Sequence, residues 1–136
     1  MIIGIGTDLC DIRRIEKSIE KFGPRFLNRV FTRGEQNYCE PKSSKAAYYA
    51  KRFAAKEAVA KALSGERTGH LRWKDVEVAN NPSGCPIILL HKTAKERLSE
   101  LLPVGHNGNM YISLTDDYPY AQAFAICEAY KTESDT

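Results

Sequence analysis

The first forty residues alternate between apolar stretches and strong helix boundaries. Residues 1–7 are apolar and β-branched, which predicts a short buried strand. Asp11 stands where a helix N-cap is expected, before the amphipathic run IRRIEKSIEKF. Gly23-Pro24 interrupts that helix, and RFLNRVF predicts a second one. Thr32 and Glu35 have the spacing of a capping box, so a third short helix follows.

An alanine-rich stretch in the middle of the chain predicts the longest helix. It runs through AAYYAKRFAAKEAVAKAL to about Leu63. Ser43 or Ser44 is its expected N-cap, and Ser64-Gly65 its expected C-terminal stop.

The second half of the chain favours antiparallel strands. DVEVAN and PIILLH flank the turn residues Asn81 to Gly84 and predict a β-hairpin. Thr93 is the expected cap of a helix over KERLSELL. NMYISLT and YAQAFAICEAY then flank a turn at residues 116–119. The pattern predicts one α+β domain over residues 1–130, with an antiparallel sheet, one long helix and several short ones, and a disordered tail over residues 131–136.

Composition narrows the class of protein. The chain has 136 residues, of which 43% are hydrophobic and 27% charged, as in one globular domain. No apolar run approaches the roughly 20 residues that a membrane-spanning helix needs. The N-terminus lacks a basic leader followed by an apolar stretch, so we expect a cytoplasmic protein. The four cysteines and three histidines show no metal-ligand spacing, and we expect reduced thiols and no histidine metal site.

Positive charge is concentrated near the N-terminus. The formal net charge is only +3, but residues 11–33 contain seven cations and three anions. Most of these cations recur at every fourth residue, which places neighbours on one side of a helix. This pattern fits either a solvated helix surface or a docking face for an acidic partner, a nucleic acid or an acidic protein.

One carboxylate falls on the apolar stripe of the long helix. Winding the helix at 100° per residue places Glu57 between Ala50, Phe53 and Ala60. Burial of an ionised carboxylate is costly without a cation, a metal or a polar groove beside it. An ion pair with Lys61, one turn further on, is the simplest explanation.

A second carboxylate, Asp8, directly follows the first expected strand. Asp is common in turns, but the C-terminal end of a strand is also a frequent location for ligand chemistry. Mg²⁺ is typically held by one or two carboxylates together with substrate phosphates, and a lysine neutralises phosphate charge. Asp8, Glu57 and Lys61 together would suit phosphoryl transfer.

The segments GIGTDLCDIRRI and RFAAKEAVAKAL resemble the bacterial holo-acyl-carrier-protein synthases, the small 4′-phosphopantetheinyl transferases. FLNRVFTRGE, the turn NNPSGCP and the final ISLTDDYPYAQAFAI occur in the order of that family, so the resemblance covers nearly the whole chain. It implies transfer of phosphopantetheine from coenzyme A to a serine of apo acyl carrier protein, with release of adenosine 3′,5′-bisphosphate, in support of fatty acid biosynthesis. It also implies a homotrimer with active sites between subunits.

The resemblance also assigns individual residues. Asp8 and Glu57 match the Mg²⁺ ligands, and Lys61 matches the lysine that contacts phosphate; these three are the expected catalytic residues. Arg14 and Arg25 match positions that contact the acidic carrier protein. Coenzyme A is expected to contact Lys61 and six further residues, namely Lys45, Tyr48, Arg52, Phe53, Ser64 and Gly65.

One position departs from the family pattern. Many relatives have a histidine after the S-x-S/T of the penultimate strand, whereas Asp116 follows Ser113-Leu114-Thr115 here. A role that depends on that histidine is therefore not expected. The alternative function is a non-catalytic module that binds RNA or another polyanion through the basic helices, but no RNA-binding sheet motif accompanies them and we expect no nucleic acid partner.

Overall fold

The computed structural model describes residues 1–65 and 71–132. Its elements follow the order β1 (Ile2–Asp11), α1 (Ile12–Phe22), α2 (Pro24–Val30), α3 (Arg33–Cys39), α4 (Lys45–Ala62), η1 (Trp73–Asp75), β2 (Val76–Asn80), β3 (Pro86–Leu90), α5 (Lys92–Leu101), β4 (His106–Asp117) and β5 (Tyr120–Lys131). The expected α+β class, with antiparallel sheets, is confirmed.

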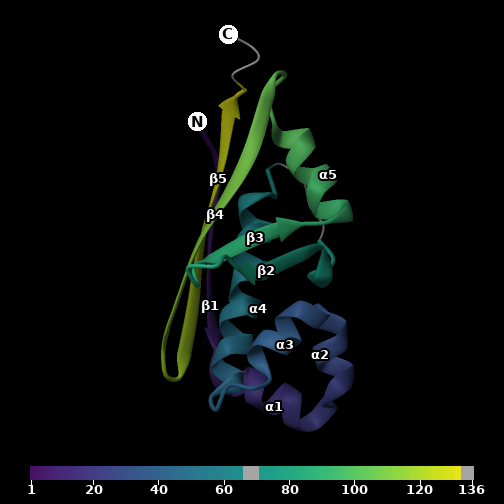
Figure 1. Cartoon of the computed structure of the whole chain (residues 1–136), viewed down its shortest axis with the longest axis vertical. Helices are drawn as coiled ribbons and strands as arrows, with labels where there is room; N and C mark the ends of the chain where they lie inside the picture. Colours follow the sequence, from purple (N-terminus) through teal and green to yellow (C-terminus); the bar gives the residue numbers. More distant parts are fainter. Residues whose placement is uncertain (66–70, 133–136) are drawn as a thin grey trace.

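A long three-stranded sheet forms one side of the molecule, and α4 lies against it (Figure 1). The strand order is β1-β5-β4, and both pairs are antiparallel. Alternate residues of β5 are small and buried, which lets the helix approach closely: Ala121, Ala123, Ala125, Cys127 and Ala129. The sheet and α4 therefore form the main part of the core.

The other face of this sheet is apolar but exposed. Its exposed large hydrophobic side chains include Ile5, Leu9, Tyr111 and Phe124, and Phe124 lies opposite both Thr7 and Ser113 in the strand register. Directly opposed residues of an antiparallel sheet share a face. The molecule thus leaves a broad apolar surface uncovered, on the side away from α4.

The remaining elements surround α4 away from the sheet. The hairpin β2-β3 crosses the helix near its middle, α1, α2 and α3 cluster at one end, and α5 lies at the other (Figure 1). The side chain of Thr32 accepts a hydrogen bond from the amide of Glu35, and Glu35 accepts one from the amide of Thr32. This confirms the expected capping box at the start of α3.

Two local expectations are wrong. Asp8 lies inside β1 rather than after it, because β1 continues pairing with β5 as far as Asp11. Thr93 does not cap α5, which begins one residue earlier at Lys92. Both the amide and the hydroxyl of Thr93 instead donate to the buried carboxylate of Asp75. A carboxylate from another element thus accepts the hydrogen bond of an otherwise unpaired amide in the first turn of α5.

The structure bears on two further expectations, the lack of a membrane-spanning helix and the disordered tail. None of the helices in residues 1–65 and 71–132 is long and apolar enough to cross a membrane. β5 extends to Lys131, and residues 133–136 of the expected tail lie outside the described residues.

Candidate active site

Two glycines bring β1 into direct contact with α4. A Cβ atom at Gly6 would collide with the carbonyl oxygen of Ala58, and one at Gly4 would collide with that of Ala62. Glycine at both positions therefore allows a strand-to-helix distance that no other residue permits. Asp8 lies on the same face of β1, opposite Ala123 in the register, and so faces α4.

Lys61 of α4 reaches across this contact to β1. Its Nζ donates to the carbonyl oxygen of Thr7 at 2.8 Å and to Asp8 Oδ1 at 3.4 Å. The Asp8 side chain is only 18% exposed, whereas that of Lys61 is 55% exposed. The partly buried carboxylate of Asp8 and the accessible ammonium of Lys61 thus form an ion pair where β1 packs closely on α4.

The electrostatics of Asp8 are those of a partly buried anion with cationic neighbours. Burial raises the pKa of its carboxyl above the usual value, while Lys61 and Arg14 oppose that increase. Burial likewise raises the pKa of the Cys10 thiol to about 11, and both Asp8 and Glu57 add to that shift through their negative charge. Both carboxylates therefore act on the same small region between β1 and α4.

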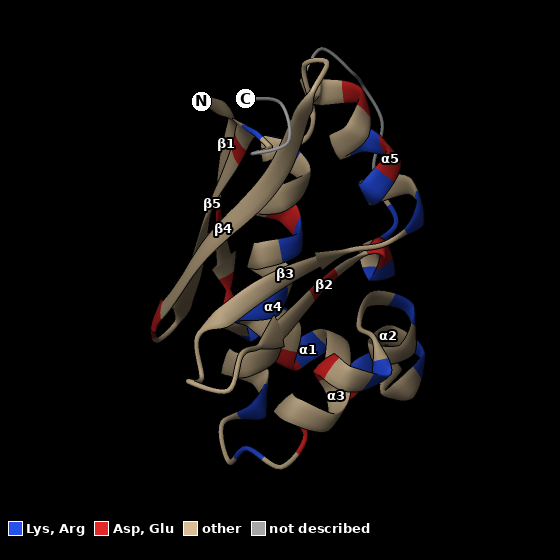
Figure 2. Ribbon diagram, turned by 45° about the horizontal axis from the view of Figure 1, so that its top comes forward, with Lys and Arg blue, Asp and Glu red and all other residues tan. Residues whose placement is uncertain are grey.

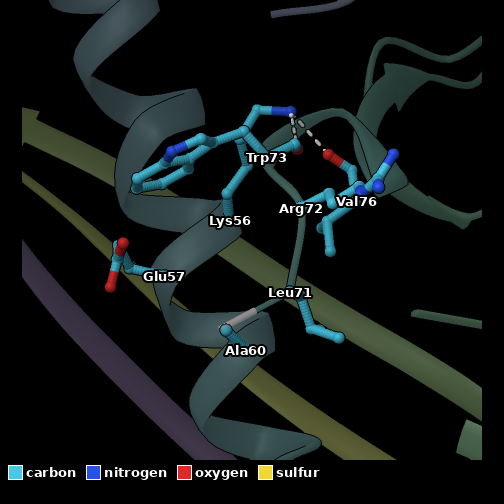
Figure 3. A pocket seen from close by; sticks show the side chains of 7 residues that line it. All are labelled: Lys56, Glu57, Ala60, Leu71, Arg72, Trp73 and Val76. Carbon is cyan, nitrogen blue, oxygen red and sulfur yellow. Dashed lines mark hydrogen bonds between the residues drawn. The ribbon is translucent and has the colours of Figure 1, made fainter. Parts of the chain in front are cut away.

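Glu57 also borders a hollow on the other side of α4. This cavity has a volume of about 290 Å³. Its lining residues are Lys56, Glu57, Ala60, Leu71, Arg72, Trp73 and Val76 (Figure 3). Trp73 stacks on Phe53, with ring centroids 4.8 Å apart. The hollow thus has an aromatic wall, a carboxylate and an arginine, which suits a ligand with apolar and charged parts.

A buried ion pair holds the wall of this hollow in place. Lys56 Nζ lies 2.8 Å from Glu35 Oε1, and both side chains are essentially inaccessible. Lys56 also donates to the carbonyl oxygens of Trp73 and Val76, as Figure 3 shows. Glu35 Oε2 accepts the amide of Val78. Every polar atom that the pair buries therefore has a partner. Because these partners belong to different elements, the pair connects α3, α4 and β2.

A cationic and aromatic cluster lies beside α3. The guanidinium of Arg52 is 97% buried, donates to Asn80 Oδ1 at 2.7 Å and lies 4.1 Å from the ring centre of Tyr38. Its Nε has no hydrogen-bond partner among the described residues. Tyr38 and Tyr48 meet edge to face, and Lys42 lies over both rings. An unpartnered buried guanidinium N–H beside a half-buried lysine suits an anion.

The other residues expected to bind coenzyme A lie at the two ends of α4. Lys45 forms an ion pair with Glu40 at 2.9 Å, so its ammonium has a carboxylate partner. Ser64 donates to the carbonyl oxygen of Lys61 at 2.8 Å. Gly65 has a φ of 54°, in the left-handed region that favours glycine. The expected set therefore follows the helix rather than forming one compact cluster.

Asp116 has a partner within the chain. Its Oδ1 lies 3.0 Å from Lys51 Nζ, which also lies over the ring of Tyr48. Asp116, the position at which the sequence departs from the expected pattern, thus lies beside the lysine and tyrosine side chains of α4.

Arg14 of α1 and Arg25 of α2 are exposed. Both helices carry several basic residues (Figure 2). Arg14 is close enough to Asp8 to lower the pKa of that carboxyl. Arg25 borders a hollow of about 220 Å³ with Phe22, Phe26 and Arg29. The basic surface of α1 is therefore close enough to Asp8 to influence it electrostatically.

Several residues of the site were missed by sequence reasoning. Trp73, Arg72 and Leu71 lie between the expected long helix and the expected hairpin, where no motif singled them out, although the single tryptophan of the chain was a signal. Tyr38 and Asn80 belong to separate elements and meet Arg52 only through the tertiary fold.

The donor set of Asp8 and Glu57 fits Mg²⁺. Mg²⁺ prefers oxygen ligands and is usually bound by one or two carboxylates together with substrate phosphates. No group of three or more His, Cys, Asp or Glu side chains that could hold a metal occurs in the part of the chain that the structure describes. A site of two carboxylates completed by a phosphorylated substrate is consistent with both observations.

Comparison with known proteins identifies the class to which this site belongs. The family profile of the 4′-phosphopantetheinyl transferase superfamily matches residues 4–123. A holo-[acyl-carrier-protein] synthase of Methylobacterium sp. (strain 4-46) is 53% identical over 134 residues, which is 98% of this chain and 99% of that protein. The chain therefore belongs to the 4′-phosphopantetheinyl transferase superfamily, in its holo-[acyl-carrier-protein] synthase family.

Solved structures agree with this assignment. The holo-[acyl-carrier-protein] synthase of Neisseria meningitidis superposes with a TM-score of 0.80 at 31% identity, over 94% of this chain and 99% of that chain. The Helicobacter pylori synthase in complex with coenzyme A gives a TM-score of 0.73 at 31% identity, over 91% and 99% of the two chains. The expected recognition is thus confirmed, and nothing in these comparisons supports an RNA-binding module.

Proposed function

We propose that this chain transfers 4′-phosphopantetheine from coenzyme A to a serine of apo acyl carrier protein. The serine oxygen forms a new bond to the phosphorus that carries pantetheine and loses its proton. The bond from that phosphorus to the oxygen of adenosine 3′,5′-bisphosphate breaks, so holo carrier and adenosine 3′,5′-bisphosphate are the products. The observation that carries the proposal is the contact of Lys61 with Asp8 across β1 and α4, beside Glu57.

Asp8 and Glu57 are proposed to hold Mg²⁺, which when bound would neutralise the diphosphate and polarise the phosphorus under attack. Lys61 is the accessible cation of the set and is proposed to contact phosphate as a point charge. Its hydrogen bond to the carbonyl oxygen of Thr7 orients the ammonium before substrate binds. The chain's own contribution is thus to position and neutralise phosphate groups.

We assign the adenosine bisphosphate of coenzyme A to residues along α4. Arg52, with its unpartnered Nε, and the neighbouring aromatic rings of Tyr48 and Phe53 suit a phosphate and a purine. Lys45 would exchange its ion pair with Glu40 for a phosphate. Ser64 and Gly65 are proposed to approach the phosphates at the other end of the helix. The complex of the Helicobacter pylori relative with coenzyme A supports this choice of substrate.

The carrier protein is proposed to dock on the basic surface of α1 and α2. Arg14 and Arg25 are exposed there, and the positive charge of Arg14 partly offsets the rise that burial causes in the pKa of Asp8. Carriers of this family are acidic, so charge complementarity favours encounter on this surface. Supply of holo carrier to fatty acid biosynthesis, and a cytoplasmic location, stay predictions.

We further propose that the enzyme is a homotrimer with active sites between subunits. The exposed apolar face of the sheet supports this proposal, because such a face is costly to leave in water. A hollow of about 290 Å³ at its edge is lined by Ile5, Gly6, Thr7, Lys61 and Phe124. A second copy covering Ile5 and Phe124 would therefore come up against Lys61 and contribute to the site.

Intact mass spectrometry tests the proposed reaction directly. Apo acyl carrier protein is incubated with the enzyme and coenzyme A, with Mg²⁺ and then with a chelator. We expect the carrier to gain the mass of one phosphopantetheine only with Mg²⁺. Absence of any gain with several carriers would contradict the proposed activity, and an equal gain with the chelator would contradict the proposed role of the metal.

A further inference from the structure

A second basic hollow lies next to the Glu57 cavity and has no role in the reaction described above. It has a volume of about 310 Å³. Four cations line it, together with Trp73 and Asp75: Arg29 from α2, Arg72 and Lys74 around η1, and Lys92 from the start of α5. We call these four residues and the hollow between them the basic groove. Three separate elements thus contribute positive charge to one concave surface.

The charge of the basic groove is not neutralised from within the chain. Among residues 1–65 and 71–132, none of its four cationic side chains forms an ion pair or a side-chain hydrogen bond. Asp75, its one carboxylate, is buried and accepts hydrogen bonds from Thr93 instead. Four unpaired cations around a hollow attract an anionic partner and repel one another without it.

The backbone of Lys92 supports a binding role. Its φ of 45° is the only positive φ of a non-glycine residue within the described ranges. A lysine in the left-handed region is strained, and such residues occur preferentially at functional sites. Contacts on either side fix this conformation, since the amide of His91 donates to the carbonyl oxygen of Asp75 and Thr93 is held by the Asp75 carboxylate. The fold therefore maintains an unfavourable conformation that adds a cation to the groove.

The position of the groove indicates its partner. Arg29 also borders the hollow of Arg25 on α2, while Arg72 and Trp73 also line the Glu57 cavity. Figure 2 shows basic residues on α2 and α5. The groove thus bridges the surface proposed for carrier docking and the cavity that contains Glu57. Because the groove shares lining residues with both hollows, a carrier that spans them would lie across it.

We propose that the basic groove binds a second acidic segment of the acyl carrier protein when the carrier is docked near the Glu57 cavity. This inference rests on the proposed function, because it takes the carrier as the acceptor. The groove would then act after the first encounter on α1 and α2, and would chiefly determine how tightly the acidic protein is held.

Steady-state kinetics with charge-reversal variants test the proposal. Lys74→Glu and Lys92→Glu should each raise the KM for apo carrier about fivefold at low salt, as expected for loss of one exposed charge pair. The KM for coenzyme A and kcat should change less than about twofold. Lys131→Glu, an exposed lysine at the end of β5 with the same change in charge, is the matched control.

Two kinetic results would overturn the proposal. One is an increase in the KM for coenzyme A instead of the carrier, which would assign the groove to the nucleotide. The other is an equal effect of Lys131→Glu, which would indicate a general effect of net charge. Fluorescence anisotropy of labelled apo carrier, without coenzyme A, separates this inference from the proposed function. Weaker binding by Lys74→Glu supports the groove even if no transfer occurs, and unchanged binding refutes it.

Discussion

Lys61 donates to Asp8 across 53 positions of sequence, at 3.4 Å, but its shorter bond of 2.8 Å goes to the carbonyl oxygen of Thr7. The ammonium is therefore held mainly by the backbone of β1. A carboxylate has about four lone-pair sites, so Asp8 keeps acceptor capacity for a cation while Lys61 stays nearby. The pair combines a fixed positive charge with an available negative one, which suits the binding of a metal and a phosphate together.

Replacement of either proposed metal ligand should remove turnover without unfolding the protein. Because loss of an outer contact to a metal ligand already costs about 10- to 100-fold, Asp8→Asn and Glu57→Gln should each lower kcat/KM at least about 100-fold. Carrier modification followed by mass spectrometry measures the loss, and thermal unfolding checks the fold. Glu96→Gln, at an exposed position of α5, is the control. Near-normal activity of Glu57→Gln would exclude that residue from the metal site.

The buried pair of Lys56 and Glu35 yields a stability prediction. Burial lowers the pKa of Lys56, and the nearby Glu35 carboxylate opposes that shift. Lys56→Met would leave Glu35 charged and buried, and should lower the free energy of unfolding by about 3–5 kcal/mol. Urea unfolding at one fixed protein concentration measures the change.

A double variant provides the control for this interpretation. Glu35→Gln added to Lys56→Met replaces the stranded charge by a neutral amide of similar shape. We expect the double variant to unfold at a higher urea concentration than Lys56→Met alone. If the two variants are equally unstable, lost packing rather than the unpaired charge accounts for the destabilisation.

The exposed face of the long sheet leads to a prediction about assembly. Phe124→Glu places a charge on the central strand of that face, in the wall of the hollow that Lys61 also lines. Analytical ultracentrifugation should show a shift from trimer to monomer, and activity should fall with it. Ser99→Glu adds the same charge on the exposed surface of α5 and should leave the trimer intact. A wild-type protein that is monomeric at all concentrations would contradict the proposed assembly.

The start of α1 should contribute to acid sensitivity. A side-chain hydrogen bond from Arg13 lowers the pKa of Asp11 from 3.8 to about 2. Because the folded pKa lies below the unfolded one, the contribution to stability is present above pH 3.8 and is lost as the pH falls towards 2. Asp11→Asn keeps a capping side chain without the charge. Thermal unfolding should therefore show wild type and Asp11→Asn converging over this pH range; a constant difference would contradict this account.

Sequence reasoning was accurate where local chemistry determines structure. The Asp11 cap, the break at Gly23-Pro24 and the capping box of Thr32 and Glu35 were all predicted, because each depends on residues close in the chain. Thr93 was assigned wrongly because its partner, Asp75, lies 18 residues away. A propensity for capping does not reveal a carboxylate supplied by another element.

The site was predictable only in part, for a related reason. The residue pattern placed Glu57 on the apolar stripe of α4, where an ion pair with Lys61 was the simplest explanation, and grouped both with Asp8 as a set suited to phosphoryl transfer. The family resemblance then assigned roles to all three. The ion pair of Glu35 with Lys56 was not visible, because a lysine on a helix is ordinarily interpreted as exposed. Its burial follows from α4 being enclosed by the sheet on one side and by β2 and α3 on others.

Gly4 and Gly6 determine more than the packing of β1 on α4. Since the strand and the helix touch through backbone atoms, the spacing of Asp8 and Lys61 does not depend on side-chain rotamers between them. The charges of Asp8 and Lys61 are therefore arranged during folding, before any ligand arrives, and little reorganisation of the backbone remains for a binding step.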